Sequence, residues 1–199
     1  MKDYSWHPER AVPKQFPRKK AESGLVMSQV PRGDLWQVLL AGPDTAAFAE
    51  ACIAALGVAP ETNRVVSATR RDGTEIAMVW AAAGDVLVSG AIDPADVAAK
   101  LEGVAYLLDQ SDGRAILCLE GPSEPLRGAL SKLLPLDLRA SAFGPGYAAA
   151  TLLDHMPVNV WCRATADAGN LAVCLAVFRS YEESLHAALA EAGFKFAGS

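Results

Sequence analysis

Residues 107–138, LLDQSDGRAILCLEGPSEPLRGALSKLLPLDL, hold the clearest structural signals of the chain. Within them, Asp112-Gly113 separates two apolar runs, residues 104–109 and 115–119. An Asp-Gly pair between such runs favours a two-residue hairpin turn, because both central positions of that turn need φ > 0. The stretch therefore predicts two strands joined as a β-hairpin.

A helix is predicted directly after this hairpin. Gly121-Pro122 ends the second strand, Ser123 is a suitable N-cap residue, and Pro135 stops the helix. The apolar residues between these limits recur at helical spacing and form one stripe: Leu126, Ala129, Leu130, Leu133 and Leu134. Because the stripe and the strands must bury their apolar side chains, we expect them to pack together as a core block.

The overall composition is typical of a globular protein with a sizeable core. The chain has 199 residues, of which 51% are hydrophobic and 21% charged, so it can form one domain or two small ones. Its net charge of -5 gives no general basis for binding nucleic acid. No run approaches the ~18 to 20 apolar residues that span a bilayer, so no membrane partner is predicted. The N-terminus lacks the apolar segment of a secretory signal, and we expect a soluble cytoplasmic protein.

Residues 1–33 are predicted to be an extended, basic, proline-rich arm. Prolines at positions 8, 13, 17 and 31 prevent a helix from propagating through it. The first twenty residues hold six basic and two acidic side chains, and Trp6 and Phe16 add apolar anchors. This combination suits an extended segment that lies along the surface of another protein. A disordered tail is the alternative.

The remaining residues, 34–199, are expected to form an α+β domain with mostly antiparallel sheets and about four helices. Beyond the opening stretch, strands are predicted at residues 35–40, 64–69, 75–81, 85–89, 147–153, 157–163 and 171–178. Beyond that stretch, helices are predicted to begin near Asp44, Asp93 and Ser180, the last of these in a capping box with Glu183. One face of the first helix is expected to hold Phe48, Cys52, Ile53, Ala55 and Leu56.

One pattern recurs in this domain. LLAGPDTAAFAEACIAALG (39–57) and LCLEGPSEPLRGALSKLLP (117–135) align without a gap on a Gly-Pro pair that follows a strand and precedes a capped helix. We interpret the match as a weak internal duplication of residues 34–103 and 104–199.

Four cysteines, at positions 52, 118, 162 and 174, show no C-x-x-C spacing and lie in apolar, periodic surroundings. We interpret them as small buried hydrophobic residues in a reducing cytosol. Disulfides or a metal site are the alternatives.

The sequence predicts no catalytic, cofactor-binding or metal-binding residue. His7, His155 and His186 have no metal-ligand spacing between them, and structural roles are expected for each. Nucleotide-binding and nucleophile-elbow motifs are missing from the sequence. Asp109, Asp112 and Asp137 could act as acids or bases only in a cleft beside a partner, and turn capping explains the first two. Arg114 and Arg179 lie at the ends of apolar strands. We expect each to pair with a nearby carboxylate and hold two segments in register, rather than to bind an anionic ligand.

Several stretches together resemble the gamma subunit of heterotetrameric sarcosine oxidase. They are LLDQSDGRAILCLEGP (107–122), LLPLDLRASAFGPGYAAATLLDHMPVNVW (133–161) and AVFRSYEESLHAAL (176–189), with a looser match at LGVAPETNRVVS (56–67). The family is similar to the folate-binding domain of aminomethyltransferases, so the resemblance implies an α+β fold of that type.

The resemblance also implies a reaction for an assembly of alpha, beta, gamma and delta subunits. Sarcosine would be oxidatively demethylated to glycine at a flavin, its methylene group passed to tetrahydrofolate, and hydrogen peroxide formed from dioxygen. FAD, FMN, NAD, zinc and tetrahydrofolate are expected in the partner subunits and not in this chain. The chain would then be a non-catalytic structural subunit.

Two alternatives remain open from the sequence. Related complexes, such as N-methylglutamate dehydrogenase, have similar gamma chains, so the substrate and electron acceptor could differ. A free-standing folate-binding protein of the aminomethyltransferase type would need Asp109 or Asp112 to face a pocket deep enough for a pterin.

Overall fold

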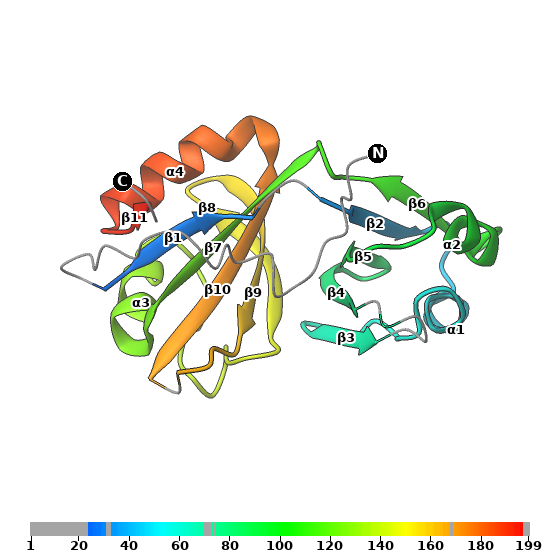
Figure 1. Ribbon diagram of the computed structural model, residues 1–199, viewed down its shortest axis with the longest axis horizontal. Coiled ribbons are helices and arrows are strands. Elements are labelled where there is room, and N and C mark those ends of the chain that lie inside the picture. Colours follow the sequence, from blue (N-terminus) through cyan, green and yellow to red (C-terminus); the bar gives the residue numbers. More distant parts are fainter. Residues whose placement is uncertain (1–23, 31–32, 70–72, 74, 168, 197–199) are drawn as a thin grey trace. The chain divides into compact units, whose positions relative to one another are not determined.

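The computed structural model describes residues 24–30, 33–69, 73, 75–167 and 169–196. These residues form two compact units, each with its own sheet and helices (Figure 1). The first unit contains residues 33–113, and the second contains residues 24–30 together with the chain from residue 114 onward. The predicted α+β class, with four α-helices and mostly antiparallel sheets, is confirmed. No helix in the described ranges is long and apolar enough to cross a membrane.

The first unit is a five-stranded antiparallel sheet with strand order β3-β4-β5-β2-β6 and two helices (Figure 1). Its elements are β2 (Leu35–Leu40), α1 (Thr45–Leu56), β3 (Val65–Thr69), β4 (Glu75–Ala82), β5 (Asp85–Ser89), α2 (Pro94–Leu101) and β6 (Ala105–Asp109). The core lies between one face of the sheet and the helices, where Val38 and Val88 join Phe48 and Leu101 in one buried cluster.

The helix starts in the first unit follow the predicted capping chemistry. The Asp44 carboxylate accepts hydrogen bonds from the backbone N–H groups of Ala46 and Ala47, both at 3.0 Å. Asp93 caps α2 in the same way, with Pro94 at the first helical position. Ile53 departs from the prediction, because its side chain is 52% exposed and lies outside the core face of α1.

The second unit is built on a six-stranded sheet with strand order β11-β1-β7-β10-β9-β8. Its elements are β1 (Val26–Gln29), β7 (Arg114–Pro122), α3 (Ser123–Leu130), β8 (Ala148–Leu153), β9 (Met156–Arg163), β10 (Asn170–Phe178), the 3-10 turn η1 (Arg179–Tyr181), α4 (Glu182–Glu191) and β11 (Lys195–Phe196). Leu126 and Leu130 of α3 and Leu185 of α4 are buried with Leu117 and Leu175 of the central strands. Full burial of such side chains contributes roughly 1.5–3 kcal/mol each, so this cluster is the main source of stability in the unit.

The predicted hairpin around Asp112-Gly113 is wrong. β6 pairs with β2 in the first unit, whereas β7 pairs with β1 and β10 in the second. Neither Asp112 nor Gly113 has a positive φ, as the predicted turn type would require. Asp112-Gly113 does separate two strands, as predicted, but these strands belong to different sheets. β7 is nine residues long, and all nine residues pair with β10. β6 has five residues, so it could not pair with β7 over that length.

The limits predicted for the arm and for the duplication also differ from the structure. Residues 26–29 of the expected arm form β1, which pairs with β7 from Val26↔Glu120 to Gln29↔Leu117. The rest of the arm, residues 1–23 and 31–32, lies outside the described residues. The units divide between Gly113 and Arg114, ten residues beyond the predicted repeat boundary. The duplication itself stays a prediction.

Two predicted caps are corrected by the structure. Ser123 is the first residue of α3 and its hydroxyl accepts a hydrogen bond from Arg127 Nε at 3.2 Å, so it does not cap the helix. α3 ends at Leu130, four residues earlier than the apolar stripe suggested. No side-chain cap bond forms at α4, where η1 replaces the predicted Ser180 box.

Candidate functional site

Arg114 and Arg127, both in the second unit, are the charged residues among the described ones that are buried, at 8% and 9% exposure. Arg114 opens β7 and is paired in register with Phe178 at the end of β10. Its guanidinium carbon lies 4.5 Å from the Phe178 ring centroid, and its Nη1 donates to Asn159 Oδ1 at 3.1 Å. The ring and the amide therefore hold this cation within the sheet.

Arg179 extends this group to α4 and β1. Its Nη1 contacts the Glu182 carboxylate at 3.0 Å, and its Nη2 donates to the Arg114 carbonyl oxygen at 2.6 Å. Gln29 Nε2 donates to the other Glu182 oxygen. We call Arg114, Asn159, Phe178, Arg179, Glu182 and Gln29 the arginine cluster.

The arginine cluster joins the ends of three strands, β1, β7 and β10, and the middle of β9 to the start of a helix. The prediction that Arg179 pairs with a carboxylate is confirmed. Arg114 contacts an amide and a ring, and the carboxylate pairing expected for it stays a prediction. Guanidinium groups stay protonated at any physiological pH, so the two arginines can orient neighbours but cannot exchange protons.

Arg127 is a structural residue that the sequence reasoning missed. It lies on α3, and its Nη1 donates to the carbonyl oxygens of Leu138 and Phe143, the latter at 2.8 Å. It thereby ties the long connection between α3 and β8 to the helix. Arg127 directly follows Leu126 of the apolar stripe, which is the only hint of burial in the sequence. A residue at that position of a helix could equally well be exposed to solvent.

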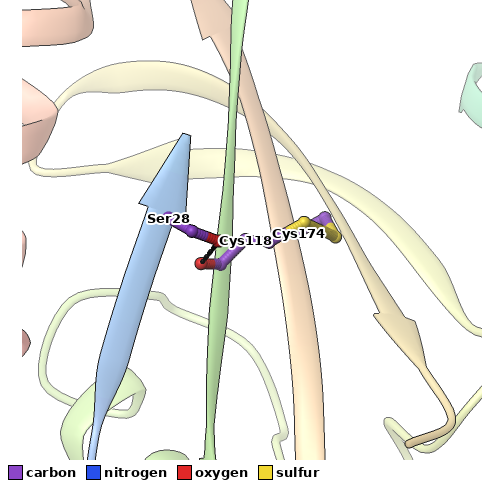
Figure 2. The surroundings of a disulfide bond; sticks show 3 residues. All are labelled: Ser28, Cys118 and Cys174. Atoms are coloured by element: carbon purple, nitrogen blue, oxygen red, sulfur yellow. Dashed lines mark hydrogen bonds between the residues drawn. A yellow bond between two sulfur atoms is a disulfide. The ribbon is translucent and has the colours of Figure 1, made fainter. Parts of the chain in front are cut away.

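The interpretation of the cysteines is wrong for one pair. Cys118 and Cys174 form a disulfide between the central strands β7 and β10 (Figure 2). Val30 N–H donates to the Ile116 carbonyl oxygen at 2.9 Å, so alternate residues of β7 direct their backbone groups at β1. Cys118 belongs to that set, as its position beside Ser28 in Figure 2 illustrates. It therefore faces Cys174 as a non-hydrogen-bonded pair, the type in which side chains come closest, and the Cα atoms are 4.2 Å apart.

The other two cysteines fit the interpretation as buried hydrophobic residues. Cys52 and Cys162 are free and buried. Burial raises the pKa of each thiol from 9.0 to about 11, although the nearby charge of Arg127 opposes the shift at Cys162. At neutral pH both remain thiols, which are poor nucleophiles and poor metal ligands.

Among the acidic candidates, Asp109 ends β6, whereas Asp112 and Asp137 lie outside the helices and strands. Asp109 Oδ1 accepts the Ser111 backbone N–H at 2.8 Å, so it serves as the predicted turn cap. Asp112 is exposed. Asp137 is exposed and contacts Arg139, and the hydrogen bonds from Arg139 lower the pKa of Asp137 to about 2. Burial, with the charge of Asp109, raises the pKa of Asp34.

The histidines occupy separate places. His7 lies outside the described residues. His155 is exposed in the tight turn between β8 and β9, where Asp154 and His155 both have positive φ. The His186 ring contacts the Phe196 ring edge to face at 4.8 Å between centroids. Within the described ranges, no three His, Cys, Asp or Glu residues gather closely enough to hold a metal ion.

Comparisons with known proteins find sarcosine oxidase gamma subunits among the relatives of the chain. The chain is 42% identical over 65 residues to the sarcosine oxidase subunit gamma of Corynebacterium sp. (strain P-1) and 44% identical over 55 residues to that of Arthrobacter sp.. These matches cover 33% and 28% of this chain, and the chain spans 31% and 26% of the two relatives. No family model matches the chain.

The fold gives a longer match. A chain of the heterotetrameric sarcosine oxidase from Corynebacterium sp. U-96, solved in complex with pyrrole 2-carboxylate, aligns with a TM-score of 0.66 and 26% identity. The alignment covers 84% of this chain and 83% of that chain. The resemblance seen in the sequence is therefore confirmed: over a segment of sequence this chain is similar to sarcosine oxidase gamma subunits, and in fold over most of its length it is similar to a chain of a heterotetrameric sarcosine oxidase.

Proposed function

We propose that the chain is the gamma subunit of a cytoplasmic heterotetrameric sarcosine oxidase and has a structural role in it. The sequence match to two gamma subunits carries the proposal, because it names the same subunit twice at more than 40% identity. The fold match to a chain of a heterotetrameric sarcosine oxidase supports it over a longer span.

The side-chain chemistry of the described residues supports a structural role. The buried Arg114 and Arg127 and the half-buried Arg179 are bonded to carbonyl oxygens, an amide and a carboxylate that fix strands, a helix and a loop. Both free thiols are held protonated by burial. Residues of these kinds hold a shape for partners to bind and need no reaction of their own.

In this proposal the alpha, beta and delta subunits hold the FAD, FMN, NAD, zinc and tetrahydrofolate. The assembly demethylates sarcosine to glycine, transfers the methylene group to tetrahydrofolate and forms hydrogen peroxide. A free-standing folate protein would need Asp109 or Asp112 to face a deep pocket, and Asp112 is exposed. Asp109 is engaged by the Ser111 backbone, and it lies at the end of an edge strand.

Co-expression tests the proposal. The chain is produced with the polypeptides encoded beside its gene, and the product is isolated through a tag on one of those neighbours. We expect a stable complex that contains this chain and bound flavin, and that releases hydrogen peroxide with sarcosine. If the chain stays a monomer beside the neighbouring flavoproteins, the proposal is wrong.

The choice of substrate has its own readout in the same preparation. Flavin reduction by sarcosine is compared with reduction by N-methylglutamate under anaerobic conditions. Faster reduction by N-methylglutamate would replace sarcosine oxidase with the related dehydrogenase, and the structural role of this chain would be unchanged.

A further inference from the structure

The edge strand β6 of the first unit exposes large apolar side chains. Tyr106 is 60% exposed and Leu108 is 40% exposed, and Leu39, which is paired in register with Tyr106, is 37% exposed. The three side chains share one face of the sheet, since Val38 and Leu107 between them pack toward the helices on the other face. We call Tyr106, Leu108 and Leu39 the edge patch.

The backbone of β6 also has unused pairing capacity. Ala41 N–H donates to the Val104 carbonyl oxygen at 2.9 Å, and Gln110 N–H donates to the Leu35 carbonyl oxygen at 2.8 Å. The two-residue repeat of an antiparallel ladder therefore turns the N–H and C=O groups of Ala105, Leu107 and Asp109 away from β2. No described strand pairs with that side of β6, which ends the order β3-β4-β5-β2-β6.

This edge lacks the usual protection against pairing. Sheet edges are commonly blocked by charged side chains, proline or a bulge. Residues 105–108 of β6, AYLL, contain neither a charged residue nor a proline, Asp109 at the end of the strand is its one charged residue, and β6 pairs with β2 in continuous register. The edge is therefore suited to receive another strand.

Charge indicates which kind of strand fits. Residues 102–113 include Glu102, Asp109 and Asp112 and no basic residue. An antiparallel pair of two β6 strands centred on Leu107 would place Glu102 of one copy opposite Asp112 of the other. Like charges in such positions destabilise pairing, whereas lysine or arginine in a different chain would complement them.

We propose that β6 is a docking strand for another subunit of the oxidase complex. The occupant is an extended segment of that subunit, with alternating apolar residues flanked by lysine or arginine. Its backbone pairs with Ala105, Leu107 and Asp109, and its apolar side chains cover the edge patch. The proposal rests on the proposed function for the existence of the complex and adds the surface through which the chain joins it.

The test compares two lysine variants in the co-expressed complex. Tyr106→Lys with Leu108→Lys places two charges on the edge patch, and Ile53→Lys is the matched control, because Ile53 is an exposed apolar residue of α1 in the same unit. Both variants alter exposed side chains, so thermal melts should match the wild type. We expect the double variant to weaken assembly by roughly tenfold or more, as measured by titration and native mass spectrometry, while Ile53→Lys assembles normally.

Hydrogen exchange gives the second readout. The Leu107 and Asp109 amides should exchange rapidly in the isolated chain and at least about tenfold more slowly in the complex. Slow exchange in the isolated monomer would mean that residues 1–23 or another part of this chain cover β6, and would overturn the proposal. A concentration-dependent homodimer that the double variant abolishes would also overturn it.

The two proposals fail in different ways. If the wild-type chain forms no complex with its neighbours, the proposed function fails and the docking strand fails with it. If the wild type and the double variant assemble equally well, only the docking strand is wrong.

Discussion

Arg127 shows how a single buried side chain can fix a long loop. Its guanidinium donates to two loop carbonyl oxygens and to the Ser123 hydroxyl, and it is 9% exposed. These acceptors are withdrawn from water, so they depend on the arginine for their hydrogen bonds.

Arg127→Met should therefore lower the free energy of unfolding by roughly 2–4 kcal/mol, because it keeps the length of the side chain and removes every donor. Urea unfolding followed by circular dichroism measures the change. Arg139→Met is the control, since the Arg139 side chain is 81% exposed and a solvent-exposed pair with Asp137 should contribute little to stability. Equal effects of the two substitutions would contradict the assigned role of Arg127.

Among the elements, β1 depends on a close backbone approach to β7. A Cβ atom at Gly121 would lie 2.9 Å from the Gly24 carbonyl oxygen and 2.9 Å from Leu25 Cδ2. Only glycine allows the chain to enter β1 along this path without a shift of the backbone.

Gly121→Ala is expected to displace the start of β1 and to destabilise the second unit by roughly 1–3 kcal/mol. Gly128→Ala is the opposite control, because Gly128 lies inside α3 with no atom within 4 Å of an added Cβ. The control should stabilise by roughly 0.5–1 kcal/mol, the helix-propensity difference between the two residues. Hydrogen exchange of the Val26 and Ser28 amides, which the register points toward β7, should accelerate only in Gly121→Ala, and unchanged protection there would contradict the prediction.

The disulfide is the second feature at the scale of elements. Cys118 and Cys174 are separated by 56 residues in the sequence, so the cross-link closes a long loop in the unfolded chain. In the chain-entropy account, loop closure of this length stabilises the folded state by roughly 4 kcal/mol.

Replacing both residues, as Cys118→Ala with Cys174→Ala, should lower the free energy of unfolding by roughly 3–4 kcal/mol. Cys162→Ala, which removes a free buried thiol, is the control. Thiol titration of the unfolded wild type should find two reactive groups without reductant and four after reduction. Four groups without reductant would show that the bond is not formed in the purified protein.

At the scale of the whole molecule, two sheets with separate cores share one chain. The charge of that chain is uneven, because the first twenty residues carry a net positive charge within a protein of net charge -5. A basic segment of this kind is suited to an acidic surface on a partner, and attraction between such surfaces weakens as salt rises.

Deletion of residues 1–23 is predicted to leave the melting temperature within about 2 °C of the wild type, since β1 and all core residues in the described ranges lie after residue 23. It should weaken assembly with the partner subunits, and the loss should be larger at low salt than at high salt. Sedimentation of the co-expressed complex at two ionic strengths measures the effect. A deletion that assembles equally well at both would show that the arm has no binding role.

The sequence by itself determined the local structure of this protein. Caps such as Asp44 and Asp93, the breaks at Gly121-Pro122 and the apolar runs of the strands depend on neighbours a few residues away, and the structure confirms the elements they predict. The stretches that resemble sarcosine oxidase gamma subunits could also be recognised from the sequence, because the resemblance depends on local residue order. They consist of residues in a fixed order.

Only the tertiary structure decided which strands pair and which buried side chains meet. Residues 107–138 predicted a hairpin, but β6 and β7 joined different sheets, because strand pairing depends on the length and apolar surface of distant partners. Cys118 and Cys174 became a cross-strand pair, and Arg114 met Asn159, through the same long-range register. The contacts that join β1, β7, β9, β10 and the start of α4 span up to 153 residues of sequence, and no local pattern encodes them.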